Sequence, residues 1–235
     1  MNLWAVMSFK NSESFLQAAL DSLRQQSDNR WKLVLINDRS ADKSPEIAKQ
    51  FMLENPDHVF YLDKIPDSAN RVSHFEMVAE AIDKMEAEDW FFFLDSDDLL
   101  CNQAVAAFHE ARVRNPEIEM AYADFQFMDI TGTKFYPSPC ASSSHVTFER
   151  LMMELCIHRP VFIKKCLYDY IGGIDRRMVR AADYDLNLRC LKEAPARMVA
   201  NIPGVHYHYR QHSLQVSRNR GEQLHWARYA REKHS

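Results

Sequence analysis

The chain has 235 residues, 46% of them hydrophobic, which is enough for one large α/β domain or for a nucleotide-binding half joined to a smaller half. Its 29 basic and 33 acidic residues give a net charge of −4 and are mixed along the sequence, which excludes a basic surface for nucleic acid or an anionic membrane. The five cysteines are an odd number without a Cys-x-x-Cys spacing, which argues against a disulfide framework or a structural zinc site. No secretory signal precedes the first predicted strand, and no apolar stretch approaches the roughly 20 residues of a membrane span. The expected location is therefore a reducing cytoplasm.

Strands and helices alternate along roughly the first hundred residues. Buried strands are predicted at 3–8, 31–36, 58–62 and 90–94, and helices with one apolar face at 15–23, 45–52 and 71–85. The strand at 90–94 shows no polar and apolar alternation, as expected of a strand covered on both faces. This βαβαβαβ order predicts a mostly parallel, doubly wound sheet.

The second half of the sequence is less regular. Strands are predicted at 120–124, 125–130 and 134–136, and helices at 147–156, 164–171 and 181–193. The Ser- and Pro-rich stretch 137–144 predicts either a mobile loop over a site or a passive surface connection. Because no linker or repeat interrupts the chain, residues 1–235 are expected to form one domain with two functional halves.

Three carboxylates follow the strand at 90–94, in the tetrad Asp95, Ser96, Asp97, Asp98. In open α/β sheets ligands bind outside the carboxyl ends of the strands. The mutual repulsion of these acids favours a bound Mg²⁺ or Mn²⁺ that bridges to a substrate diphosphate. The alternative is a solvated acidic helix start, in which Asp97 or Asp98 caps a helix that begins near Asn102.

Five segments occur in an order that resembles the family 2 glycosyltransferases. They are the first strand and turn at 6–11 with the apolar helix face that follows, the polar loop 37–42, the tetrad 95–98, the Gly-Gly-Ile-Asp segment 172–175, and the Ala-Asp-Tyr-Asp-Leu-Asn-Leu-Arg segment 182–189. The resemblance covers nearly the whole chain. It implies the GT-A fold, an α/β architecture with a Rossmann-like, mostly parallel sheet flanked by helices. The nucleotide-sugar-binding half would span about 1–100 and the smaller acceptor-binding half about 101–235.

The resemblance assigns donor-binding roles to side chains of the first half. Asp97, in the position of the DXD motif, is expected to hold Mn²⁺ or Mg²⁺ against the diphosphate, with Asp95 at the ribose or sugar hydroxyls or sharing the metal. Asp38 is expected to accept a hydrogen bond from the nucleobase, with Ser8 lining the same pocket; an Asx-turn is the alternative for Asp38. Arg71 is expected above the donor, or else as a solvated arginine at a helix start.

The segment 206–212 resembles the Tyr-Arg-x-His stretch of many relatives, and its alternating His and Tyr residues predict an edge strand. Arg210 is expected to pair with the diphosphate, His208 to complete the metal shell and His212 to lie near the phosphates. The competing interpretation of each histidine is an ordinary surface side chain.

The resemblance points to Asp183 as the general base that takes the proton from an acceptor hydroxyl. Asp185 lies about 200° further around the helix and is expected to face elsewhere. The alternative is that Asp183 only caps its helix. Ala182 replaces the glutamate that is usual in the family, which leaves room for a weakened enzyme. No second carboxylate is identifiable as a nucleophile, so an inverting single displacement is expected.

The resemblance therefore implies a metal-dependent inverting glycosyltransferase. Its donor would be a nucleotide diphosphate sugar and its acceptor a hydroxyl of a glycan or lipid-linked acceptor, in bacterial surface polysaccharide synthesis. It would act in the cytoplasm or at the inner face of the membrane, with membrane-associated assembly partners and no nucleic acid.

Other classes fit the sequence less well. The departures at Ala182, Lys10 and Arg39 suggest, as the alternative, a non-catalytic nucleotide-sugar-binding scaffold domain of a polysaccharide-assembly complex. The glycine-free turn at 8–14 lacks the phosphate loop of a sugar nucleotidyltransferase, and the first strand lacks the nucleophilic aspartate of a phosphatase.

Overall fold

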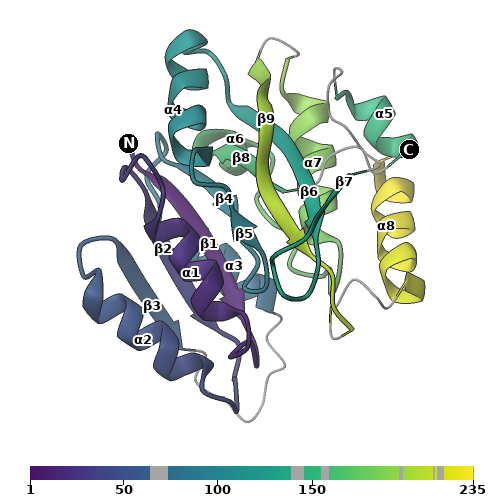
Figure 1. Ribbon diagram of the computed structural model, residues 1–235. Helices are drawn as coiled ribbons and strands as arrows, with labels where there is room; N and C mark the ends of the chain where they lie inside the picture. Colours follow the sequence, from purple (N-terminus) through teal and green to yellow (C-terminus); the bar gives the residue numbers. More distant parts are fainter. Residues whose placement is uncertain are drawn as a thin grey trace.

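The structure is a computed structural model that describes residues 1–63, 74–138, 146–154, 159–195, 198–213, 215 and 220–234. One curved sheet runs through the molecule, with helices on both of its faces (Figure 1). None of the helices within these described ranges is long and apolar enough to cross a membrane. Arg71 and most of the predicted loop 137–144 lie outside the described residues.

The first four strands are parallel and lie in the order β3-β2-β1-β4. They are β1 (Leu3–Phe9), β2 (Lys32–Asn37), β3 (Val59–Asp63) and β4 (Trp90–Phe93). The helices between them are α1 (Leu16–Arg24), α2 (Ser44–Glu54) and α3 (His74–Asp83). The predicted βαβαβαβ order is confirmed, and because the strands are parallel the loops after β1, β2 and β4 meet at one edge of the sheet.

Antiparallel pairings complete the sheet in the second half. The strand β8 (Val161–Lys164) pairs antiparallel with β4 and with β6 (Met120–Met128), and so joins the two halves. On the far side of β6, β9 (Val199–Arg210) runs parallel to it and carries the short β5 (Leu99–Leu100), while β7 (Phe135–Pro137) forms a hairpin with β6. The remaining helices are α4 (Ala104–Arg114), α5 (Phe148–Met153), α6 (Lys165–Tyr170), α7 (Ala182–Glu193) and α8 (Arg220–His234).

The second half also contains the differences from the sequence prediction. The two strands predicted at 120–124 and 125–130 are one strand, in which the pairing register shifts on either side of Asp124. The segment 206–212 does not form an edge strand, because β9 pairs with β6 on one side and with β5 on the other. The strands β5 and β8 were not predicted, since two to four apolar residues carry no periodicity.

The strand β4 is covered on both faces, as its sequence predicts. Trp90 and Phe92 belong to a core with α1, α2 and α4, whereas Phe91 points into a second core with α3, α6 and α7. All three side chains are at most 1% exposed. The ring of Phe108 on α4 lies 5.1 Å from that of Trp90 and 4.7 Å from that of Phe162 on β8, which ties both halves of the sheet to one aromatic stack.

Removing the Phe108 ring is expected to destabilise the protein strongly. The Phe108→Ala variant leaves a cavity among buried rings, and such truncations cost about 3–5 kcal/mol of unfolding free energy. Val113 on the same helix is 80% exposed, so Val113→Ala is the matched control and should change stability by less than about 0.5 kcal/mol. Urea denaturation of both variants measures the difference; equal midpoints would contradict the assignment of the stack to the core.

Candidate functional site

The loops after β1, β2 and β4 are bonded to one another at the carboxyl edge of the parallel strands. The hydroxyls of Ser12 and Ser96 lie 2.8 Å apart, which joins the first loop to the tetrad. The Asn11 side-chain oxygen accepts from the Ala41 amide at 2.8 Å, which joins the first loop to the second. The three loops therefore form one continuous polar rim above the sheet.

The predicted nucleobase residues lie on this rim. Ser8 is half-buried near the end of β1 and stands opposite Ile36 of β2. The Asp38 amide donates to the carbonyl of Phe9 at 2.9 Å, and its carboxylate lies 3.9 Å from Lys10 Nζ and 3.2 Å from Arg39 Nε. Asp38 thus holds the start of the second loop beside the end of β1.

Asp98 is a buried anchor of the tetrad. Its carboxylate accepts from the hydroxyl of Tyr207 and from the amide of Arg210, both at 2.8 Å, and only 1% of the residue is exposed. The Tyr207 hydroxyl also accepts from the Asp95 amide at 3.1 Å. Burial, together with the neighbouring charges of Asp97 and Asp95, raises the pKa of Asp98 well above its ordinary value. Asp98 therefore attaches β9 to the tetrad, with a hydrogen bond to each of its oxygens.

The Tyr207→Phe variant is expected to loosen this attachment. It removes one donor to a buried carboxylate and one acceptor of a backbone amide, which should cost about 1–3 kcal/mol of unfolding free energy. The exposed Tyr170, with 75% of its surface accessible, supplies the control Tyr170→Phe. Thermal or urea unfolding measures both, and equal stabilities would show that the Tyr207 hydroxyl contributes nothing.

Asp97 and His212 meet at the rim. The Asp97 carboxylate lies 2.8 Å from His212 Nε2, and the two side chains are 25% and 6% exposed. The His212 ring packs against Phe15 with 4.6 Å between ring centres. This pair brings the tetrad and the end of β9 to the same point, and it leaves an edge of Asp97 open to solvent.

Arg210 holds the backbone of the site. Its Nε donates to the Asp97 carbonyl at 2.6 Å and its Nη1 to the Ile130 carbonyl at 2.7 Å, and only 3% of the residue is exposed. The guanidinium lies 5.0 Å from the centre of the Phe15 ring. A Cβ on Gly132 would stand 3.0 Å from Nη1, so the glycine leaves room for the arginine. The structure thus directs Arg210 toward carbonyl oxygens of the rim.

Arg159 links the tetrad to the predicted general base. Its Nε is hydrogen-bonded to the Asp95 carboxylate, its terminal nitrogen lies 3.4 Å from the Asp183 carboxylate, and its guanidinium lies over the Phe93 ring at 5.2 Å. Burial opposes the charge of Arg159, but Asp95 and Asp183 raise its pKa above the ordinary value. The side chains of Asp95 and Asp183 are 39% and 41% exposed, so both still face solvent.

Sequence reasoning did not find Arg159, and the reason is topological. Because β8 runs antiparallel to β4, with Phe92 opposite Phe162, the residues before β8 return to the carboxyl end of β4. A predicted β8 would have pointed to Arg159 as a cation beside Asp95. Asp183 itself stands in the first turn of α7, where its Oδ1 accepts from the Tyr184 amide at 3.0 Å.

His208 lies apart from the Asp97 carboxylate in the structure. Its Nε2 is 3.2 Å from the Cys101 sulfur, and its ring lies 4.4 Å from that of Phe135. Burial raises the pKa of Cys101 to about 11 and lowers that of His208, so this contact joins a neutral thiol to a ring whose protonation is disfavoured. Of the two histidines predicted near the metal and phosphates, the structure brings His212 to Asp97.

Comparison with known proteins gives the family of the first half of the chain. The model of glycosyl transferase family 2 matches residues 4–117, which include the first two loops and the tetrad. Residues 4–117 belong to glycosyl transferase family 2. This family 2 region contains every strand of the parallel half of the sheet, and the resemblance of its loops to the family motifs is confirmed.

Two curated relatives have names that describe cell-envelope synthesis. A teichoic acid poly(glycerol phosphate) polymerase of Staphylococcus epidermidis is 25% identical over 108 residues, 46% of this chain and 14% of that protein. A PGL/p-HBAD biosynthesis glycosyltransferase of Mycobacterium tuberculosis is 25% identical over 181 residues, 77% of this chain and 66% of that protein. The chain thus spans less than two thirds of the length of these relatives.

Solved structures share the fold over most of the chain. TarS of S. aureus, in complex with UDP-GlcNAc, superposes with a TM-score of 0.73 at 15% identity, over 92% of this chain and 60% of that one. The mannosyltransferase PcManGT from Pyrobaculum calidifontis, in complex with GDP-Man and Mn²⁺, gives a TM-score of 0.71 at 13% identity, over 100% and 64%. The predicted GT-A fold is confirmed.

Proposed function

We propose that this chain is an inverting glycosyltransferase that moves a sugar from a nucleotide diphosphate sugar to a hydroxyl of a glycan or lipid-linked acceptor. The observation that carries the proposal is the meeting of two groups of side chains at one edge of the sheet. Asp97 and His212 form one group, and Asp95, Arg159 and Asp183 form the other. A donor held by the first group would present its sugar to the second.

The donor side is supported by the rim of the parallel half. Asp38 and Ser8, which lie at the ends of neighbouring strands, would line a nucleobase pocket, and Asp95, which is hydrogen-bonded to Arg159, would contact sugar or ribose hydroxyls. Because TarS binds UDP-GlcNAc and PcManGT binds GDP-Man on the same fold, the donor is a nucleotide sugar, with UDP and GDP as the first nucleotides to test.

The side chains at Asp97 fit a divalent cation. The described residues contain no group of three or more metal-binding side chains, so Asp97 and His212 would supply two ligands and leave the other positions to diphosphate oxygens and water. An imidazole nitrogen favours Mn²⁺ over Mg²⁺, which prefers oxygen ligands. When bound, the cation would offset the negative charge of the departing nucleoside diphosphate.

Asp183 is the general base of the proposed reaction. The acceptor oxygen forms a bond to the anomeric carbon, the bond from that carbon to the diphosphate breaks, and the proton of the acceptor hydroxyl passes to the Asp183 carboxylate. Arg159 keeps that carboxylate on the same side of the site as Asp95. A single displacement of this kind inverts the anomeric configuration.

The acceptor class rests on the names of the relatives. They describe a teichoic acid polymerase and a glycosyltransferase of PGL/p-HBAD biosynthesis, so we propose a surface polysaccharide or glycolipid acceptor. With a lipid-linked acceptor, the enzyme would act in the cytoplasm at the inner face of the membrane, beside membrane-associated assembly partners.

Calorimetric titration with UDP, GDP, CDP and dTDP, each with and without Mn²⁺, is the first test. Metal-dependent binding of one nucleotide is expected, followed by release of that nucleotide from the matching sugar donor when an acceptor is present. Proton NMR of the product would then give the anomeric configuration, and retention would overturn the single displacement. Nucleotide binding with no transfer to any acceptor would favour the scaffold function, which the substitution of Ala182 for glutamate also suggests.

A further inference from the structure

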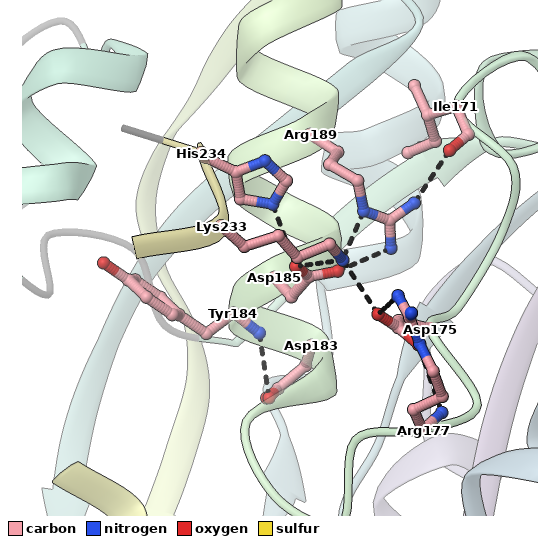
Figure 2. A network of polar contacts seen from close by, with 9 residues as sticks. All are labelled: Ile171, Asp175, Arg177, Asp183, Tyr184, Asp185, Arg189, Lys233 and His234. Carbon is pink, nitrogen blue, oxygen red and sulfur yellow. Dashed lines mark hydrogen bonds and ion pairs between the residues drawn. The ribbon is translucent and has the colours of Figure 1, made fainter. Parts of the chain in front are cut away.

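Asp185, two residues beyond Asp183 on α7, is a fully buried carboxylate surrounded by basic side chains. It is 0% exposed, and Arg189 Nε donates to one of its oxygens at 2.8 Å. Its other oxygen lies 3.0 Å from Lys233 Nζ and 2.9 Å from His234 Nε2, both at the end of α8 (Figure 2). Burial acts to raise its pKa, but Arg189, His234 and Lys233 together hold the pKa of Asp185 below the ordinary value.

Lys233 extends this contact to the segment that precedes α7. Its Nζ lies 2.8 Å from the Asp175 carboxylate as well as 3.0 Å from that of Asp185. Arg177 donates to both oxygens of Asp175, at 2.9 and 2.8 Å. The last turn of α8 is therefore bonded both to the first turn of α7 and to the Gly-Gly-Ile-Asp segment that leads into it.

The N-cap residue of α7 supplies no side-chain cap. The residue at its N-cap, Ala181, is in the left-handed region with φ 55° and makes no capping hydrogen bond. A non-glycine residue in that region is strained and is retained where the surroundings fix it. Next to Asp183, the Tyr184 hydroxyl donates to the Leu151 carbonyl at 2.7 Å and accepts from Arg231 Nε of α8 at 2.8 Å.

The charges at the two helix ends are complementary. The N-terminus of α7 carries Asp183 and Asp185, and the C-terminus of α8 carries Lys233 and His234. Acids are favoured at helix N-termini and cations at helix C-termini, so the contact also compensates both helix dipoles. Losing Lys233 or His234 leaves the buried Asp185 carboxylate with fewer partners, which disturbs the local structure.

We propose that Lys233 and His234 are positioning residues for the general base, because they hold the first turn of α7 and thereby fix where Asp183 points. In Figure 2 the Asp183 side chain points away from the cations while Asp185 points into them. The two acids thus have different roles: Asp185 is bonded to α8, and Asp183 faces the site. This inference rests on the proposed base role of Asp183.

The test compares Lys233→Met and His234→Ala with a control on the same helix. Arg228 is 80% exposed and pairs with Glu232, so Arg228→Met removes a cation of α8 without touching Asp185. In sugar-transfer assays the first two variants should lose roughly 10- to 100-fold in kcat, as expected for a misplaced catalytic group. KM for the donor and the calorimetric affinity for the nucleotide should stay unchanged, because Asp97 and His212 are untouched.

Two further measurements separate positioning from general destabilisation. Lys233→Arg and His234→Gln restore a donor at each position and should recover most of kcat. Hydrogen–deuterium exchange should show faster exchange at 182–188 in Lys233→Met and His234→Ala, with the amides of β1 and β4 unchanged. A parallel loss of nucleotide affinity and kcat, or unchanged exchange at 182–188, would overturn the proposal.

The exchange readout also separates this inference from the proposed function. If the wild-type chain transfers no sugar, the proposed function fails and with it the base role of Asp183. The exchange experiment would still show whether Lys233 and His234 fix the first turn of α7, since it needs no substrate.

Discussion

The Asp183→Asn variant is expected to lose sugar transfer while it keeps nucleotide binding. Asparagine has nearly the same volume but cannot take the proton of the acceptor hydroxyl, and loss of a general base lowers kcat by about 10²–10⁴-fold. The side chain is 41% exposed and lies in the first turn of α7, so the fold should tolerate the change. Single-turnover transfer and calorimetric nucleotide titration measure the two properties separately.

Asp57→Asn is the matched control for this experiment. Asp57 is exposed in the turn before β3, at the edge of the parallel strands opposite to the site, so the same chemical change there should leave kcat unaltered. If Asp183→Asn transferred sugar at the wild-type rate, Asp183 would not be the base. In that case its contact with Arg159 would be structural only.

The Asp97→Asn variant is expected to lose the metal-dependent part of nucleotide binding. The Asp97 carboxylate is one of the two protein groups that we propose as ligands of the cation, and it is 25% exposed. Even loss of an outer-shell partner weakens metal sites by about 10–100-fold, so loss of a direct ligand should reduce affinity in Mn²⁺ by at least that factor. Calorimetric titrations with nucleotide, one in EDTA and one in Mn²⁺, compare the affinity without and with the metal.

The His212→Ala variant is the second test, because it removes the other member of the pair, two residues after β9. Both variants should bind nucleotide in EDTA as the wild type does, and neither should gain affinity when Mn²⁺ is added. An Mn²⁺-dependent gain of wild-type size in Asp97→Asn would show that the cation is held elsewhere. The Asp57→Asn variant again reports any general effect of an Asp to Asn change.

The parallel half of the fold could be predicted from the sequence because its strands are apolar runs separated by helices with one apolar face. The rule that ligands bind outside the carboxyl ends of the strands then indicates the tetrad as a site, and the family resemblance adds Asp38. Family resemblance added Asp183, which lies far away in the sequence and shares no periodic pattern with the rim.

The rest of the site depends on antiparallel strand pairings, and strands as short as these cannot be recognised in the sequence. Arg159 reaches Asp95 only because β8 returns along β4, and two to four apolar residues are not distinguishable from a loop or a helix end. The different roles of Asp97 and Asp98 within the tetrad also could not be predicted from the sequence. Whether an acid faces solvent, as Asp97 does, or is buried under Tyr207, as Asp98 is, depends on tertiary contacts more than 100 residues away in sequence.

The pair formed by Asp97 and His212 also has a consequence for the order of folding, since 115 positions separate its two members. The carboxylate leaves the ribosome early, directly after the four strands whose parallel pairings with one another lie within the first hundred residues, whereas the imidazole arrives only after β9. Contacts of such long range close late, because the entropy of the intervening chain opposes them until β6, β8 and β9 have docked. Nascent chains that end before residue 212 would therefore lack one of the two proposed ligands of the cation, and metal affinity would report the last step of assembly.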